Sequence, residues 1–266
     1  MLKKLKMEAD TYRVMQKTIL WIALGAIISW SYYRAFVEQY PDGGGAEMII
    51  WVLTNHHYIL VFLPILLLAF TSARSGEARR YPVLLRCGTR AKAQEARLGA
   101  RGLFALFMVL SQVLMLIVAG SGLPIRGNLF PEADNVDGII TCQCLNIICY
   151  LFFMLLMREI FQNLFRNTAL ELFFTMLIPI FTRAAVLAQN TRMVLISPWG
   201  NIAYTLVNNL PGLHTVNGLG ILVEEERSSY RFYWQYWLAV LAVSVILAVL
   251  LERNRDYIFE QNRRSM

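Results

Sequence analysis

Long apolar runs constrain the fold of this chain more than any other feature. Hydrophobic residues make up 57% of its 266 residues and charged residues 16%, whereas soluble domains average about 45–50% and about 25%. A helix needs about 20 apolar residues to cross the roughly 30 Å hydrocarbon core of a bilayer. Runs near that length occur at about 18–37, 55–73, 103–123, 138–157, 169–188 and 232–252. The pattern predicts an all-α membrane protein with six transmembrane helices in a single domain, residues 1–266.

Few polar or helix-breaking residues interrupt these runs. Pro64 and Pro179 lie within the second and fifth runs, where membrane helices tolerate proline if neighbouring groups satisfy the freed carbonyl. Gln112, Gln143 and Asn146 lie within the third and fourth runs. Neutral polar residues in membrane helices commonly form hydrogen bonds between helices, so we expect these three to join helices rather than to bind a substrate.

Basic residues are distributed unevenly among the segments that join the runs. Placing the N-terminus inside puts 19 of the 25 Lys and Arg residues on the cytoplasmic side and nine acidic residues in the outer segments 38–54, 124–137 and 189–231. Because cytoplasmic segments of membrane proteins carry an excess of Lys and Arg, we expect a multi-pass cell-membrane protein with both termini in the cytoplasm. The net charge of +7 is then a topology signal, and no nucleic-acid partner is expected.

Two further segments are predicted to lie against the membrane. Within residues 1–17, apolar positions recur at spacings of three and four while the lysines fall elsewhere, which predicts an interfacial amphipathic helix; an ordinary basic flank is the alternative. Residues 194–207, after the fifth run, are too short to span and too apolar for a simple loop. A re-entrant or surface-lying helical segment fits that length.

The sequence lacks the common motifs of enzymatic chemistry. It contains no G-x-x-x-x-G-K-[ST] phosphate loop, no H-E-x-x-H and no G-x-S-x-G, and the spacing of its four cysteines fits no zinc site. We therefore expect neither an enzyme nor a metal or cofactor bound by this chain. Ionisable residues within membranes are the default functional candidates. Glu171 and Arg183 lie near opposite ends of the fifth run, where each either lines a pathway or marks a helix end.

The segment between the second and third runs, residues 74–101, is strongly basic. It contains eight Lys or Arg residues and two acids, together with a short apolar patch. Glu77, the pair Leu84 and Leu85, and the closing step Thr89 and Arg90 stand in the order typical of the ABC type-2 permease family, which this chain resembles. The resemblance extends to the N-terminal amphipathic helix, the six runs and the apolar segment after the fifth.

The resemblance implies a function and a set of partners. In that family the loop between spans two and three forms a coupling helix that seats in a groove on a separate ATPase subunit. This chain would accordingly be the membrane-spanning subunit of an ATP-driven exporter, paired with a second permease, identical or similar, and with two ATPase subunits that bind ATP and Mg²⁺. The implied ATPase-coupling residues, an apolar plug with rim charges, are Glu77, Arg79, Arg80, Tyr81, Val83, Leu84, Leu85 and Arg86. The alternative is a positive-inside loop that lies on lipid headgroups.

The sequence leaves the cargo and two other classes of function open. Few fixed charges lie in the runs, which favours an amphipathic or hydrophobic cargo: a peptide such as a bacteriocin, a lipid or a drug. An ion-coupled secondary transporter is the first alternative, because Pro64 and Pro179 supply helix breaks of the kind found in such carriers. A membrane protein of immunity or signalling is the second.

Overall fold

The protein is a bundle of α-helices. The computed structural model describes residues 2–55, 58, 62–72, 90–125, 127, 136–165, 167–187 and 234–253. No strand occurs among these residues. The helices are α1 (Leu2–Gln39), α2 (Gly45–Thr54), α3 (Leu63–Ser72), α5 (Arg90–Ala119), α6 (Val136–Phe165), α7 (Thr168–Leu187) and α11 (Trp234–Arg253). The predicted all-α fold class is confirmed for the described part of the chain.

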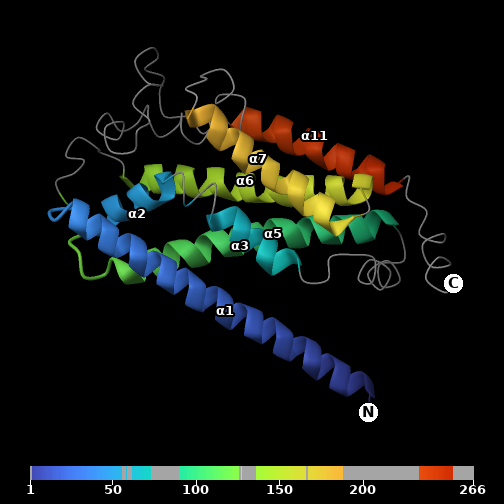
Figure 1. Ribbon diagram of the computed structural model, residues 1–266, viewed down its shortest axis with the longest axis horizontal. Coiled ribbons are helices and arrows are strands. Elements are labelled where there is room, and N and C mark those ends of the chain that lie inside the picture. Colours follow the sequence, from blue (N-terminus) through green and yellow to red (C-terminus); the bar gives the residue numbers. More distant parts are fainter. Residues whose placement is uncertain are drawn as a thin grey trace.

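Helix α6 is the centre of the bundle. It packs against α11, α7, α5, α2 and α3, and Figure 1 shows it between α7 and α11 on one side and α5 on the other. Within its apolar stretch 56% of the residues are buried, compared with 28% for α5 and 22% for α1. Helix α1 contacts only α5 and α2 extensively and lies at the edge of the bundle. The central helix therefore positions most of the others.

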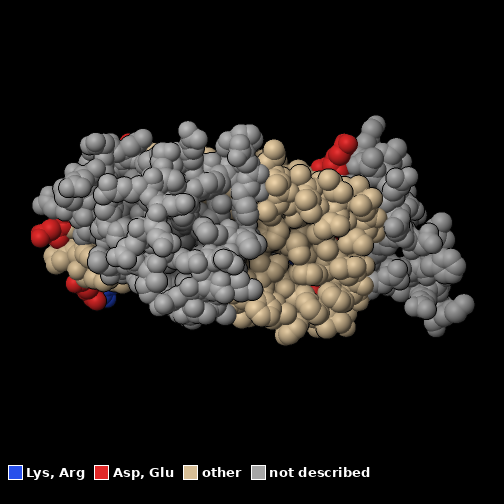
Figure 2. All heavy atoms as spheres, turned by 90° about the horizontal axis from the view of Figure 1, so that it is seen from above, with Lys and Arg blue, Asp and Glu red and all other residues tan. Residues whose placement is uncertain are grey.

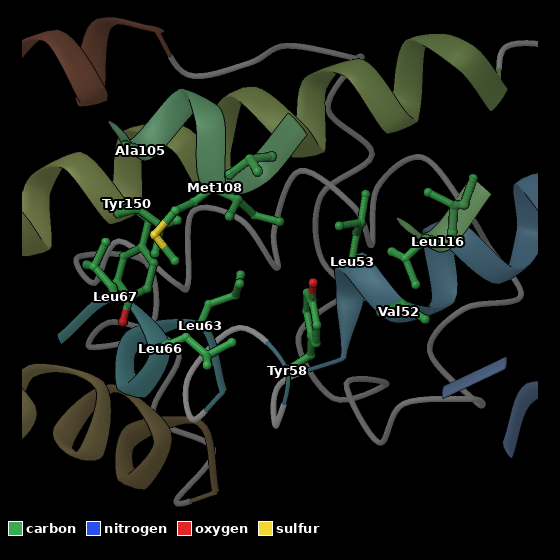
Figure 3. Close-up of a cluster of buried hydrophobic side chains, with 14 of the residues drawn as sticks. Val52, Leu53, Tyr58, Leu63, Leu66, Leu67, Ala105, Met108, Leu116 and Tyr150 are labelled. Carbon is green, nitrogen blue, oxygen red and sulfur yellow. The ribbon is translucent and has the colours of Figure 1, made fainter. Parts of the chain in front are cut away.

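The hydrophobic core is built by short as well as long helices. Figure 3 shows side chains from α2, α3, α5 and α6 converging around Tyr58 and Met108, both of which are almost completely buried. Tyr32 of α1 extends this cluster through edge contacts with Trp51 and Tyr58, at ring centroid distances of 6.0 and 5.4 Å. Gly25 allows α1 to approach α5, because an added Cβ would overlap the side chains of Met115 and Gln112. Small residues allow this kind of close approach between membrane helices.

Three helices are long and apolar enough to cross a membrane: Ile19–Gln39, Arg97–Ala119 and Gln143–Phe165. They overlap the first, third and fourth predicted spans. The fifth and sixth predicted spans form α7 and α11, whose apolar parts, Ala169–Phe181 and Trp237–Glu252, are shorter. Much of the described surface is apolar, and the face in Figure 2 shows few Lys, Arg, Asp or Glu side chains. These features are compatible with a membrane protein.

The N-terminal region differs from the expected interfacial helix followed by a separate span. Residues 2–39 form one uninterrupted helix of 38 residues, which is straight in Figure 1. The physical reason is local: residues 2–24 contain neither glycine nor proline, so nothing breaks the backbone hydrogen-bond ladder near residue 17. A straight helix cannot lie in the membrane plane over one half and cross the membrane over the other.

The predicted outer segment 38–54 also differs from expectation, because it contains the buried helix α2. The chain turns at residues 40–44 and enters α2, in which the six successive residues from Met48 to Leu53 are all buried. Contacts of α2 with α6, α5 and α1 account for this burial. A ten-residue apolar helix is too short to span a bilayer. A search for runs of spanning length therefore assigned these residues to an outer loop.

The two prolines of the predicted spans occupy different positions in their helices. Pro64 is the second residue of α3 (Leu63–Ser72), and residue 62, directly before α3, is already helical. Pro179 lies inside α7, which continues through it. The expectation that a helix tolerates Pro179 is confirmed.

Candidate functional site: a buried charge network

Charged side chains from four helices meet at one end of the bundle. At this end, on the right of Figure 1, α5 and α7 begin while α6 and α11 end. We call the cluster the charge network and its end of the bundle the charged end. Its members are Arg97 and Arg101 of α5, Arg158, Glu159 and Asn163 of α6, Glu171 of α7 and Glu252 of α11. Three arginines and three glutamates make the network electrically neutral.

Helix geometry explains how so few residues join so many helices. Arg97 and Arg101 are four residues apart on α5, as are Glu159 and Asn163 on α6, and residues at that spacing share one face of a helix. Arg158 and Glu159 are adjacent on α6, so their side chains point about 100° apart. Arg158 therefore reaches α7 while Glu159 reaches α5.

The first ion pair joins α6 to α7. The guanidinium of Arg158 donates through Nε to Oε1 of Glu171, and both side chains are buried. Glu171 lies in the first turn of α7, where Asn167 caps the helix by accepting a hydrogen bond from the main-chain nitrogen of Ala169 at 2.8 Å. A carboxylate in this turn also interacts favourably with the positive end of the helix dipole.

The other pairs join α5 to α6 and α11. Nη2 of Arg97 donates to Oε1 of Glu252 at 2.6 Å, and Nδ2 of Asn163 donates to Oε2 of the same carboxylate at 3.4 Å. Arg101 forms an ion pair with Glu159. The arginines of α5 are partly exposed, 17% for Arg97 and 24% for Arg101, whereas their glutamate partners are almost completely buried. Even so, Nε and Nη1 of Arg97 and Nη1 of Arg101 are buried.

Burial makes this arrangement costly unless every charge is matched. Glu159, Glu171 and Glu252 are exposed by 1%, 0% and 2%, and removing a carboxylate from water costs several kcal/mol (about 2–7 or more) unless a cation and hydrogen bonds replace the solvent. Each glutamate has an arginine partner. The chemical capacity of the site is to orient helices and to break or re-form ion pairs. No group of three potential metal ligands occurs among the described residues.

Neutral hydrogen bonds join the helices away from the charged end. The hydroxyl of Tyr58 donates to Oε1 of Gln112 at 2.9 Å, and Nε2 of Gln143 donates to the carbonyl oxygen of Leu53 at 2.6 Å. Nε1 of Trp237 donates to Oδ1 of Asn146 at 2.8 Å. The predicted role of Gln112, Gln143 and Asn146 in joining helices is confirmed. Cys144 and Cys149 pack against the hydrophobic core.

The structure relates only part of the sequence-predicted site to this network. Glu171 is a member of it. Residue 183 lies in the last turns of α7, at the end opposite Glu171. The predicted ATPase-coupling residues 77–86 and the predicted re-entrant segment 194–207 lie outside the described residues.

Sequence reasoning missed the other charged members of the network. From the sequence, Arg97, Arg101 and Arg158 were interpreted only as positive charges that set the membrane topology. Glu252 was only the last residue of the sixth predicted span. A usable signal was present: the spacing of four between Arg97 and Arg101, repeated between Glu159 and Asn163, places polar pairs on single helix faces.

Comparison of the chain with family models, with curated proteins and with solved structures finds no match. A functional assignment therefore depends on the sequence and on the geometry of the described residues.

Proposed function

We propose that this protein is the membrane-spanning subunit of an ATP-driven exporter, powered by two separate ATPase subunits and paired with a second permease. Its cargo is an amphipathic or hydrophobic molecule, such as a peptide, a lipid or a drug. Both termini and the segment 77–86 face the cytoplasm, where ATP and Mg²⁺ bind the partner subunits. The helical bundle, its apolar surface and the absence of a phosphate-binding loop motif support this assignment.

The observation that carries the proposal is the position of α5. This helix begins at Arg90, directly after the basic and apolar segment 77–86, and its arginines pair with Glu159 of α6 and Glu252 of α11. A force on the segment would reach α5 through a few residues of chain. The ion pairs would then distribute that force to two more helices. This connection is what an energy-coupling segment requires.

The test is capture of the ATPase by the affinity-tagged full chain in detergent. We expect an ATPase subunit without membrane spans to co-purify, and the double variant Leu84→Asp/Leu85→Asp to lose it, because a buried apolar anchor carries most of the energy of such an interface. The matched control is Ile125→Asp, an 85% exposed residue in the turn that follows α5. ATPase capture and ATP-dependent export that survive in the double variant would contradict the proposal.

The charge network favours an ion-coupled carrier as the second candidate, because three buried carboxylates and their arginine partners lie within the bundle, and charged groups inside membrane proteins often mark ion pathways. The two candidates differ in their energy source. In vesicles, an exporter of the proposed kind loses transport when ATP is withheld and keeps it when a protonophore collapses the proton gradient. The opposite result would favour the carrier.

A further inference from the structure

The three ion pairs of the charge network differ in what supports them. The Arg158–Glu171 pair joins helices that are adjacent in the chain and extensively packed. Beside it the ring of Phe165 stacks on Phe174, with centroids 4.5 Å apart, and Phe161 packs on both. These contacts would hold α6 and α7 together even without the ion pair.

The Arg97–Glu252 pair has little comparable support. Both α5 and α11 pack on α6, on its two sides in Figure 1, and α5 and α11 are not among the extensively packed helix pairs. The ion pair between these two helices depends on a long arginine side chain and joins residues 155 positions apart in sequence. A small displacement of α5 would therefore separate this pair first.

If this ion pair separates, each of its members has another hydrogen-bonding partner available. The Arg97 side chain is 17% exposed, but its Nε and Nη1 atoms are buried, so the guanidinium exchanges the carboxylate for water only once α5 moves. Its Nε and Nη1 atoms have no hydrogen-bond partner among the described residues, and water would satisfy them after a small displacement. Glu252 retains the hydrogen bond donated by Asn163 of α6.

We propose that Arg97 and Glu252 form a reversible latch between α5 and α11, while the α6–α7 hairpin is a fixed unit. Movement of α5 opens the latch and uncouples α5 from the end of α11, which packing on α6 and the Asn163 hydrogen bond continue to hold in the bundle. Arg97 lies in the second turn of α5, seven residues after the helix begins, so a rigid helix transmits a push on the preceding segment directly to it. The idea that an ATPase supplies this push rests on the proposed function, whereas the latch between α5 and α11 does not.

The test uses the full chain alone in lipid nanodiscs, without an ATPase, and measures amide hydrogen exchange. Arg97→Gln should raise exchange several-fold in the last turns of α11, because local opening there no longer breaks an ion pair. Exchange in α7 should stay unchanged. The charge-reversed double variant Arg97→Glu/Glu252→Arg should restore slow exchange. The matched control is Glu95→Gln, an exposed residue on the same helix, which should change neither region.

Two results would overturn the latch: unchanged exchange of α11 in Arg97→Gln, or a uniform rise across all helices, which indicates a structural pair rather than a local one. Failure of the charge reversal to restore protection, in a variant that still folds, would also overturn it. The experiment contains no ATPase, so its outcome is independent of whether an ATPase binds the segment 77–86. Loss of ATPase capture would defeat the proposed function and leave the latch intact.

Discussion

The two ends of the bundle are held together by different kinds of contact. At the charged end, ion pairs between long side chains join α5, α6, α7 and α11. At the opposite end, main-chain atoms of two turns bond directly: the nitrogens of Gly45 and Ala46 donate to the carbonyl oxygens of Pro124 and Ile125, at 2.8 and 3.2 Å. The carboxylate of Glu47 accepts a hydrogen bond from Gly44 at 2.7 Å and caps α2.

This difference shows which end can change conformation. Main-chain contacts lose their geometry if either segment shifts by about an ångström, since N–H···O hydrogen bonds usually span only about 2.7–3.2 Å and weaken steeply when they bend. Long arginine side chains can follow a moving helix or exchange a carboxylate for water. Aromatic packing of Phe36 with Trp51, at a centroid distance of 5.8 Å, further consolidates the opposite end. We infer that the opposite end is the rigid one.

Removal of a fully buried cation at the charged end should produce the largest effect. Arg158→Ala leaves Glu171, which is 0% exposed, without its cationic partner, and breaking one side of a buried pair costs about 3–5 kcal/mol. Denaturant unfolding of the purified chain in detergent measures this loss. Glu95→Gln, at an exposed position on α5, serves as the control. A loss below about 1 kcal/mol, the range of exposed pairs, would show that the pair is not buried as described.

Overpacking should produce the next largest effect, at the opposite end. Gly127→Ala places a Cβ against the main-chain nitrogen of Gly44 and the carbonyl oxygen of Asp42. Backbone must shift to admit it, and such strain costs about 1–3 kcal/mol. Gly122→Ala is the matched control, because its Cβ meets nothing within 4 Å. Equal melting temperatures for the two variants would refute the rigid packing of this end.

A smaller effect is expected between the two ends, where the contacts are neutral. Trp237→Phe removes the donor to Asn146 while keeping most of the ring, and hydrogen bonds between membrane helices contribute about 0.6–2 kcal/mol. Trp30→Phe, at a residue that is 57% exposed, should be close to neutral. Thermal unfolding of both variants, monitored by circular dichroism, measures the difference. A Trp237 variant as stable as the Trp30 variant would show that this hydrogen bond does not stabilise the bundle.

The smallest effect is expected on the apolar surface. Leu114 is 61% exposed, and lipid chains are as apolar as leucine, so Leu114→Ala should change stability by less than about 0.5 kcal/mol. Leu116, two residues along the same helix, is completely buried. Leu116→Ala should cost about 2–5 kcal/mol through the cavity that it leaves. Similar losses in the two variants would mean that the exposed face of α5 is covered by protein rather than by lipid.

Much of the helical organisation could be predicted from apolar length and the distribution of charge. The runs at 169–188 and 232–252 became α7 (Thr168–Leu187) and α11 (Trp234–Arg253), almost residue for residue. Helix α5 begins at Arg90, well before the run predicted from residue 103. Charged residues lower hydropathy without stopping a helix, so the apolar run marks only part of α5. Helix α2 was not predicted, because its apolar run is shorter than a span and a buried helix need not cross a bilayer.

The candidate site could be predicted only in part. Glu171 was identified because a carboxylate within an apolar run is rare. Its partner Arg158 was not identified, although the two residues are only 13 positions apart. The two side chains face each other only because α7 folds back against α6, which the sequence does not show. The spacing of Arg97 and Arg101 could indicate a polar face, but local spacing could not predict the pairing of Arg97 with Glu252, 155 positions away.

The sequence by itself determined that the chain forms helices, where most of them lie and which residues carry charge at their ends, because apolar length and backbone propensity are local properties. The tertiary structure alone decided which charges meet. That choice depends on how each helix is rotated about its axis and on which neighbours pack against α6. Since the cost of burying a charge falls only when a partner arrives from another helix, the charge network is a property of the bundle and not of any segment.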